Sequence, residues 1–307
     1  MKTKNCIVCG SNKIESIYQL RDYRLDDDNK SYQYRKCNSC GLIFQDPILS
    51  YEDLVIHYNQ KQIYNEKIPK KGVKFFLYEY GLKKRAKVVL KNKLSGKLLD
   101  IGCGSGNFIR YISDKTEFQV FGNEINKENV NTLKRKYGLD VRIGNIYSIN
   151  FPDKHFDVIT LWDVIEHIEN PNQILVEIKR ILKPDGILVI RVPNGDSLDS
   201  KIFDKYWAGL DAPRHLYIFS ISCITKLLEN NSFSIKSKRT DIGGYLNFIN
   251  SISFMFNGIK VNRKLKNAIL KVLRSVFFQF LFFPLIWIKN QALLGTSLTI
   301  VAQNSDN

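Results

Sequence analysis

The central part of the chain alternates between two patterns of apolar residues. Short, nearly continuous apolar runs, such as Leu98-Leu99-Asp100-Ile101, are separated by longer segments with apolar residues every three or four positions. A continuous run predicts a strand that is covered on both faces of a parallel sheet, and the spaced pattern predicts a helix with one buried face. The alternation therefore predicts an α/β protein.

The pattern also gives the approximate bounds of each element. Strands are predicted over residues 97–101, 119–123, 140–143, 156–161, 187–192, 233–238 and 297–302. Helices are predicted over residues 75–94, from 107, over 127–137 and 173–182, and from the Ser220 cap to 228. Lys183-Pro184-Asp185-Gly186 predicts a turn after the fourth of these helices.

A glycine-rich turn follows the first central strand. Gly102, Gly104 and Gly106 stand at alternate positions, directly after Asp100. Glycines let a ligand approach the backbone closely, and the free N–H groups of the next helix face the same loop. An acid before the loop would repel a pyrophosphate but suits a cationic amino-acid group, and Glu124 ends the next strand, where an acid binds ribose hydroxyls. Together these residues favour S-adenosylmethionine over NAD.

These residues carry a resemblance to a known family. The Asp100-x-Gly102-x-Gly104-x-Gly106 signature, Glu124 and the run from Phe156 to His167 resemble the class I S-adenosylmethionine-dependent methyltransferases, over residues 75–303. The resemblance implies a Rossmann-like, seven-stranded sheet with helices on both faces. It implies these cofactor-binding residues: Asp100, Gly102, Cys103, Gly104, Gly106, Glu124, Asn145, Trp162 and Asp163. Asn145 stands where the family usually has an aspartate that binds the adenine amino group, and its amide oxygen can still accept that bond.

Two cysteine knuckles lie near the start of the chain. Cys6-x-x-Cys9-Gly10 and Cys37-x-x-Cys40-Gly41 supply four thiolates, and short strands are predicted between them over 14–20 and 31–36, joined by a turn at 26–29. Four cysteines suit a tetrahedral structural zinc site and leave no open position for catalysis. The spacing therefore predicts a zinc-ribbon-like module. Free buried cysteines are the alternative.

The segment after the fifth central strand gathers aromatic, basic and imidazole side chains. Tyr206 to Tyr217 includes Asp211-Ala212-Pro213-Arg214-His215, which resembles small-molecule methyltransferases that carry Asp-x-Pro-Arg-His. We expect the acceptor to contact this segment through Trp207, Asp211, Arg214 and Tyr217. His215 is the first candidate general base and His167 the second, because imidazole titrates near neutral pH. Arg214 either binds an acidic or phosphorylated acceptor or pairs with Asp211. The alternatives for the histidines are that His215 fixes Asp211 or the backbone and that His167 supports the turn after the fourth strand.

Residues 243–294 are predicted to be a helical insertion before the last strand. The insertion carries several lysines and arginines without any acid, followed by an aromatic-rich apolar run over 276–288 that contains Pro284. The run is shorter than the roughly twenty residues that cross a bilayer. A basic stretch beside aromatic residues predicts an interfacial helix on anionic lipid. A lid over the substrate and a dimer face are the alternatives.

These features divide the chain into four predicted parts. Residues 1–46 form the zinc-ribbon-like module, 47–96 a linker and helix, 97–242 with 295–303 the methyltransferase domain, and 243–294 the insertion. The order of ribbon and methyltransferase also resembles sugar C-methyltransferases. The opening residues are polar and carry cysteines, so no signal peptide is expected. The chain is predicted to be cytoplasmic, with a peripheral position at the inner face of the membrane.

Charge changes the expected partner. The 307 residues contain 46 Lys and Arg against 30 Asp and Glu, a net charge of +16. The excess predicts an acidic partner, although a biased composition also explains it. Nucleic-acid methylation is less expected, because Trp162-Asp163-Val164-Ile165 differs from the Pro-Pro motif of base methylation. The preferred function is methyl transfer to a lipid-linked, glycan or polysaccharide-pathway intermediate. An RNA methyltransferase or a non-catalytic S-adenosylmethionine-binding scaffold is the alternative, and the oligomeric state does not follow from the sequence.

Overall fold

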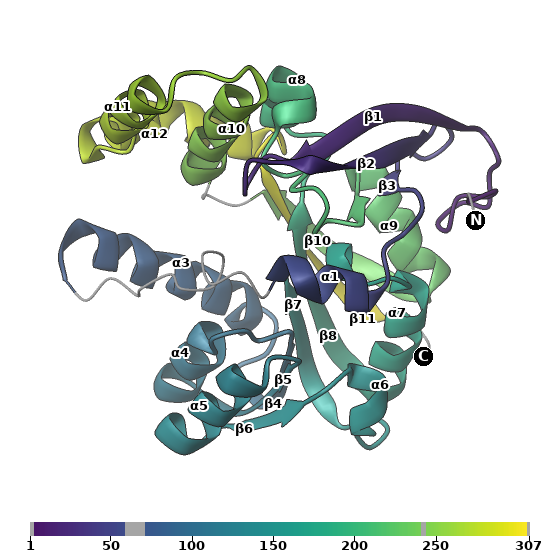
Figure 1. Cartoon of the computed structure of the whole chain (residues 1–307). Coiled ribbons are helices and arrows are strands. Elements are labelled where there is room, and N and C mark those ends of the chain that lie inside the picture. The colour runs from purple at the N-terminus through teal and green to yellow at the C-terminus, as the bar shows by residue number, and fades with distance from the viewer. Residues whose placement is uncertain (1–2, 59–70, 241–243, 306–307) are drawn as a thin grey trace. The chain divides into compact units, whose positions relative to one another are not determined.

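The computed structural model describes residues 3–58, 71–240 and 244–305 (Figure 1). Two compact units make up the chain, and each consists of several segments. The first unit takes Met1–Tyr64, Val192–Leu227 and Arg239–Thr299, and the second takes Asn65–Arg191, Leu228–Lys238 and Ile300–Asn307. The predicted boundaries of the four parts stay a prediction, but the cysteine-bearing segment shares its unit with two later segments of the chain.

A seven-stranded sheet forms the centre of the second unit. Its order is β10-β11-β8-β7-β4-β5-β6, and the neighbours β6 to β5, β5 to β4, β4 to β7 and β7 to β8 run parallel. The strands are β4 (Ser95–Ile101), β5 (Glu117–Glu124), β6 (Asp140–Ile143), β7 (Phe156–Trp162), β8 (Leu182–Pro193), β10 (Phe233–Thr240) and β11 (Ser297–Asn304). The chain order reverses on either side of β4, and ligands bind at the carboxyl ends of strands beside such a point. The predicted Rossmann-like sheet is confirmed.

Helices cover both faces of this sheet. They are α3 (Gly72–Leu90), α4 (Asn107–Lys115), α5 (Lys127–Tyr137), α6 (Ile146–Ile149), η1 (Ile165–His167) and α7 (Pro171–Ile181). Figure 1 shows α4 and α5 on one face and α7 on the other. Side-chain caps start α5 and α7, where the Asn126 oxygen accepts from the Asn129 N–H at 3.0 Å and the Asn170 oxygen from the Gln173 N–H at 3.2 Å. The cap of α6 is Asn145.

The sequence predicted a turn over residues 183–186 between a helix and the next strand, and this prediction was wrong. β8 runs through these residues from Leu182 to Pro193. Phe156 pairs with Leu182 and Val158 with Ile187, so four residues of β8, 183–186, lie opposite the single residue Asp157 of β7. The extra residues form an irregularity inside the strand, because the ladder resumes on both sides of it.

The first unit contains a four-stranded sheet in the order β1-β2-β3-β9. Its strands are β1 (Ile14–Asp22), β2 (Asp27–Cys37), β3 (Ile43–Gln45) and β9 (Tyr217–Ile218), with antiparallel pairing throughout. Ile43 pairs with Ile218 and Phe44 with Tyr217. The segment predicted to contact the acceptor therefore supplies the fourth strand of the cysteine-bearing sheet.

The predicted linker contains a helix that was not predicted from the sequence. This helix, α1, runs from Tyr51 to Tyr58, and the rest of the linker up to residue 70 lies outside the described residues. The Ser50 hydroxyl accepts from the Asp53 N–H at 3.2 Å and donates to the Asp53 carboxylate at 2.9 Å. Ser-x-x-Asp is a helix-start signal that was available in the sequence.

The later segments of the first unit are mostly helical. They hold α8 (Leu198–Phe203), η2 (Asp204–Tyr206), most of α9 (Ile221–Asn230), α10 (Gly244–Gly258), α11 (Arg263–Leu273) and α12 (Val276–Gln291). Ser220 caps α9 as predicted, since its hydroxyl accepts from the Cys223 N–H at 3.1 Å. Among the described helices, none alone has the length and apolarity of a membrane span. By length and composition, α11 and α12 together are long and apolar enough for a span, but the chain bends by 67° between them.

Candidate functional site

The glycine loop joins β4 to α4 in the second unit. Gly102, Gly104 and Gly106 have φ angles of 67°, 56° and 73°, which glycine adopts without strain. A Cβ atom at Gly102 would lie 2.8 Å from a Val164 methyl, and one at Gly106 would lie 2.2 Å from a Leu133 methyl. A Cβ at Gly104 would meet no atom within 4 Å. The outer glycines are therefore fixed by packing, and the middle one leaves open space for a ligand.

Backbone donors hold the carboxylate of Glu124 beside this loop. The Gly104 N–H donates to Oε2 and the Asn126 N–H to Oε1, both at 2.8 Å. The Asn123 amide donates to the Gly144 carbonyl at 2.6 Å and ties the end of β5 to the end of β6. A carboxylate fixed in this way presents its remaining lone pairs in a defined direction, which suits a pair of ribose hydroxyls.

Asp100 is buried at the end of β4, with 3% of its surface exposed. The Thr160 hydroxyl on β7 donates to Asp100 Oδ1 at 2.6 Å. Burial raises the pKa of Asp100 to about 7 and the nearby Glu124 charge adds to this, while the Thr160 bond and Arg85 act in the opposite direction. A cationic group at this position would favour the charged form of the acid.

Two predicted cofactor residues also have structural roles. The amide oxygen of Asn145 accepts from the Tyr147 N–H at 3.0 Å and caps α6. A carbonyl oxygen has a second lone pair, so this cap is compatible with an adenine contact. Cys103 is buried, and its sulfur lies 2.9 Å from the place where a Cβ of Gly122 would stand, so this side chain packs against β5.

The turn after β7 combines an aromatic ring with charged groups. Trp162 is 8% exposed, contacts Phe108 edge to face at 5.1 Å, and lies 5.3 Å from the guanidinium of Arg85. In the described part of the chain its Nε1 finds no hydrogen-bond partner. Asp163 pairs with Arg191 of β8, whose Nε donates at 3.0 Å. Arg85 and Arg191 were not singled out from the sequence, which has no local signal for them.

These residues of the second unit fit S-adenosylmethionine. The open side of Gly104, the fixed carboxylate of Glu124 and the buried acid Asp100 supply a backbone approach, a hydroxyl acceptor and a counter-charge. The buried Nε1 of Trp162, which has no hydrogen-bond partner among the described residues, is a polar atom that a ligand can satisfy. His167 lies in the same unit, in η1 directly after the turn.

The four knuckle cysteines of the first unit lie together. Cys6 and Cys40 have their sulfurs 3.5 Å apart, as do Cys9 and Cys37, and all four sulfurs lie within 4.8 Å of one another. Zn–S bonds of about 2.3 Å in a tetrahedron place the sulfurs at a similar mutual spacing. Burial acts to raise the pKa of Cys37. The backbone N–H groups of Cys40 and Ser39 act in the opposite direction, and the resulting pKa is about 7. Backbone donors therefore face the Cys37 sulfur.

The predicted acceptor segment is largely buried inside the first unit. Trp207 is 2% exposed and packs in a core with Leu20, Tyr34 and Ile218, and Tyr217 is 2% exposed on β9. This burial shows that both aromatic side chains have a packing role. Their predicted contact with an acceptor stays a prediction.

Arg214 is enclosed by two carboxylates. Its guanidinium donates to Asp22 at 2.7 and 2.8 Å and to Asp211 at 2.9 and 3.1 Å, and Arg24 donates to Asp211 at 2.8 Å. Burial would raise the pKa of Asp211, but Arg24 and Arg214 hold it well below its usual value. The alternative reading of the sequence, an ion pair between Arg214 and Asp211, is what the structure contains.

His215 follows this ion pair. Its Nδ1 lies 2.7 Å from the Gly209 carbonyl, and the Tyr34 hydroxyl donates to the His215 carbonyl at 2.8 Å. A carbonyl only accepts, so Nδ1 carries the proton and Nε2 the lone pair of the neutral ring. Burial lowers the pKa of His215, which keeps the ring neutral. This tautomer is the one that a base acting through Nε2 requires.

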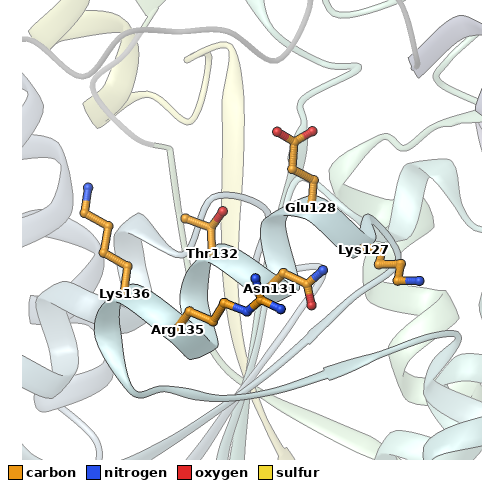
Figure 2. Close-up of a pocket in the computed structure, with 6 residues that line it drawn as sticks. All are labelled: Lys127, Glu128, Asn131, Thr132, Arg135 and Lys136. Carbon is orange, nitrogen blue, oxygen red and sulfur yellow. The ribbon is translucent and has the colours of Figure 1, made fainter.

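A surface hollow lies along α5. Figure 2 shows it lined by side chains of this one helix. The lining residues are Lys127, Glu128, Asn131, Thr132, Arg135 and Lys136. All of them are exposed, and none belongs to the cofactor set. The hollow is therefore not the candidate site.

Comparison with known proteins gives the class of protein that the glycine loop and the sheet define. A family model described as a methyltransferase domain matches residues 75–238, more than half of the chain. The chain belongs to this family, the class I S-adenosylmethionine-dependent methyltransferases. The predicted fold and cofactor class are thus confirmed.

Individual relatives agree with this class. An uncharacterized methyltransferase of Schizosaccharomyces pombe is 31% identical over 129 residues, which cover 37% of this chain and 45% of that protein. A Mycolicibacterium smegmatis protein named "Probable S-adenosylmethionine-dependent methyltransferase" is 28% identical over 48% of this chain and 56% of its own length. The chain thus spans about half the length of these curated relatives.

A solved structure shows the same fold. The "putative sarcosine dimethylglycine methyltransferase" of Galdieria sulphuraria superposes with a TM-score of 0.51 at 15% identity. The superposition covers 80% of this chain and 92% of that one. At this identity the likeness concerns the fold alone.

Proposed function

We propose that the chain transfers the methyl group of S-adenosylmethionine to a lipid-linked, glycan or polysaccharide-pathway intermediate at the cytoplasmic face of a membrane. Methyl transfer follows from the family, and the bound cofactor supplies an activated methyl group. The residues that would hold it are those of the glycine loop with Asp100, Glu124 and Trp162. The observation that carries the membrane part is the apolar outer surface of α12.

The two sides of α12 differ in their contacts. Its inner side includes Phe282, whose ring lies 5.9 Å from Tyr245 and 5.7 Å from Phe248 of α10. Its outer side exposes Phe277 and Phe280 at 70% each and Trp287 at 52%. Large exposed apolar patches mark contact surfaces. Aromatic side chains of this kind enter the boundary between lipid headgroups and acyl chains.

Positive charge accompanies this surface. Lys260, Arg263, Lys264, Lys271 and Arg274 are exposed on and beside α11. Residues 243–294 contain no Asp or Glu. Each basic residue near an anionic surface contributes about 1 kcal/mol of attraction. Apolar and basic groups in one helical segment support an anionic lipid surface as the partner.

A buried ion pair connects α12 to α8. Lys289 on α12 donates to Asp199 on α8 at 2.5 Å, with 6% and 1% of the two residues exposed. Breaking a buried pair leaves an uncompensated charge and costs about 3–5 kcal/mol. This contact holds α12 on its own unit.

A structural zinc ion completes the proposal. The four sulfurs of Cys6, Cys9, Cys37 and Cys40 match the ligand type and mutual spacing of a closed tetrahedral site. The ion would fix the end of the four-stranded sheet and would not take part in methyl transfer. The roles of His215 and His167 as candidate bases, expected from the sequence, stay predictions.

Vesicle sedimentation tests the membrane part. We expect the protein to bind phosphatidylglycerol vesicles more tightly than phosphatidylcholine vesicles, with weaker binding at high salt. Replacement of Phe277, Phe280 and Trp287 by Ser is expected to remove most of this binding, because these side chains lose their apolar contact with lipid. Phe282 is left intact because it packs against α10.

The matched control replaces Leu94, Val176 and Ile202 by Ser. These three side chains are exposed at 74%, 63% and 58% and lie outside α12. Circular dichroism confirms that both variants are folded. Equal binding by the two variants would contradict the proposed lipid surface and leave α12 as a lid or a dimer face. Binding of single-stranded RNA in place of vesicles would move the function to a nucleic-acid acceptor.

A further inference from the structure

Glu166 is a carboxyl group that the fold buries completely. It lies in η1, directly after β7, and 0% of its surface is exposed. Both of its oxygens are buried, and neither has a hydrogen-bond partner among the residues with a described position. Asp100 and Glu124 differ, because each accepts bonds from the protein.

Such a group destabilises the folded protein. Transfer of a polar group out of water without a replacement bond is unfavourable, and buried polar atoms in proteins nearly always have partners. Gln or Met at this position would have a similar volume without the charge. An acid that lowers stability and lies in a candidate site is a functional candidate.

The surroundings of η1 connect Glu166 to the methyl-donor loop. Val164, two residues earlier, packs against Gly102, since a methyl of Val164 lies 2.8 Å from the place of a Gly102 Cβ. β4 and β7, which lead into these two segments, are neighbours in the sheet. Glu166 therefore follows β7, and the glycine loop follows the neighbouring strand β4. Both lie at the carboxyl end of the sheet, where ligands bind.

We propose that Glu166 accepts the proton that the methyl acceptor releases. As a lone pair of the acceptor atom forms the bond to the methyl carbon, the carbon–sulfur bond breaks and its electron pair stays on sulfur. The acceptor's proton passes to the Glu166 carboxylate, so S-adenosylhomocysteine and a carboxylic acid result. The inference rests on methyl transfer, not on the membrane acceptor, and it makes the acceptor an O–H, N–H or acidic C–H group.

The charged groups near Glu166 define how it titrates. Burial raises its pKa well above the usual 4.5 and Asp163 raises it further, whereas Arg191 on β8 lowers it; His167 is its neighbour on η1. A raised pKa in the folded state means that the native protein holds the proton more tightly than the unfolded chain. The stability contribution is therefore present below the unfolded pKa and is lost as the pH rises toward the folded pKa.

The first measurement compares thermal unfolding of the wild type and Glu166→Gln at increasing pH. The wild type should lose stability from about pH 5 upward relative to the variant, because only the wild type must ionise a buried acid. The midpoint difference should thus grow in favour of the variant. Glu169→Gln, an exposed acid three residues later, is the control and should show no such trend. A pH-independent difference for Glu166→Gln would overturn the proposal, since this carboxyl would not titrate.

The second measurement follows methyl transfer. The probe is methyl-labelled S-adenosylmethionine with a membrane and small-molecule extract of cells that make the protein. Glu166→Gln should bind S-adenosylmethionine as the wild type does but transfer label at least about 100-fold more slowly, the usual contribution of a general base. Wild-type transfer by this variant, or loss of cofactor binding, would refute the role. Absence of transfer by every variant including the wild type would count against the proposed function, while the pH measurement still decides on Glu166.

Discussion

Asp100 and Glu124, the two acids of the candidate cofactor site, differ in their hydrogen bonds and in their protonation. Glu124 accepts two backbone N–H bonds, which hold its direction. Asp100 accepts one hydroxyl bond in a buried position, and its pKa is raised to about 7. The free protein therefore carries Asp100 partly protonated near neutral pH. A cationic ligand beside Asp100 would lower the pKa of this acid and so favour its charged form.

This difference predicts a pH-dependent cofactor affinity. Binding of S-adenosylmethionine, measured by calorimetry, should strengthen from about pH 6 to about pH 8, because the fraction of charged Asp100 rises over that range. Asp100→Asn keeps an oxygen for the Thr160 hydroxyl and should preserve the fold. It should weaken binding roughly tenfold or more, since a bond to a charged group contributes about 1.5–3 kcal/mol.

Asp114→Asn provides the control for this prediction. Asp114 is exposed on α4, outside the glycine loop, and its replacement should leave both the affinity and its pH dependence unchanged. An Asp100→Asn variant with wild-type affinity at every pH would sink the assignment of Asp100 as the counter-charge.

At the scale of elements, Arg214 joins β1 to the segment before β9. Asp22 ends β1, and Asp211 lies in that later segment. The ion pairs are enclosed, with Arg214 exposed at 1%. A hydrophobic core with Trp207 accompanies them. The segment that resembles an acceptor-binding motif is therefore also the part that completes the first sheet.

Arg214→Met should strongly destabilise this unit. Removing one partner leaves the other charges buried and costs about 3–5 kcal/mol in the free energy of unfolding, measured with urea. Because the pKa of Asp211 is held below its usual 3.8, wild-type stability should fall as the pH drops below about 4, and the variant should lack much of this fall.

Arg24→Met is the matched control. Arg24 also bonds Asp211, but its side chain is 38% exposed, so its loss should cost no more than about 1 kcal/mol. Equal stability of the Arg214→Met variant and the wild type would show that the two carboxylates do not depend on this guanidinium.

At the scale of the whole molecule, chain order and spatial order differ. The first unit draws residues from three separated stretches, and the four-cysteine cluster belongs to it. A metal ion at this cluster would stabilise one end of a sheet whose last strand comes from residues 217–218. Its loss should therefore affect the first unit more than the second.

Chelation tests this expectation. A strong chelator with a zinc-sensitive dye should release about one zinc per chain, and the released protein should unfold at a lower temperature, because structural zinc contributes folding free energy. Cys223→Ser is the control: its sulfur lies 4.0 Å from that of Cys40 but outside the four-sulfur set, so zinc content should not change. Metal-free protein with four reactive thiols would contradict the zinc site.

The sequence alone determined the central sheet, the glycine loop and the four cysteines. These depend on local patterns: apolar runs predict strands, positive φ angles require glycine, and a Cys-x-x-Cys spacing places two sulfurs together. Helix α5 was predicted over its observed span, Lys127–Tyr137, and the structure shows an Asn cap and a C-terminal glycine at its two ends. Strand β6 was likewise predicted as Asp140–Ile143.

Only the tertiary structure decided which partners distant residues find. Arg214 bonds Asp22, 192 positions earlier, and Tyr217 pairs with Phe44 of β3. The complete burial of Glu166, and the division of α12 into a packed and an exposed side, are equally absent from local patterns. Periodicity along a chain records which face of an element is apolar, whereas long-range packing determines what covers that face and which charges meet.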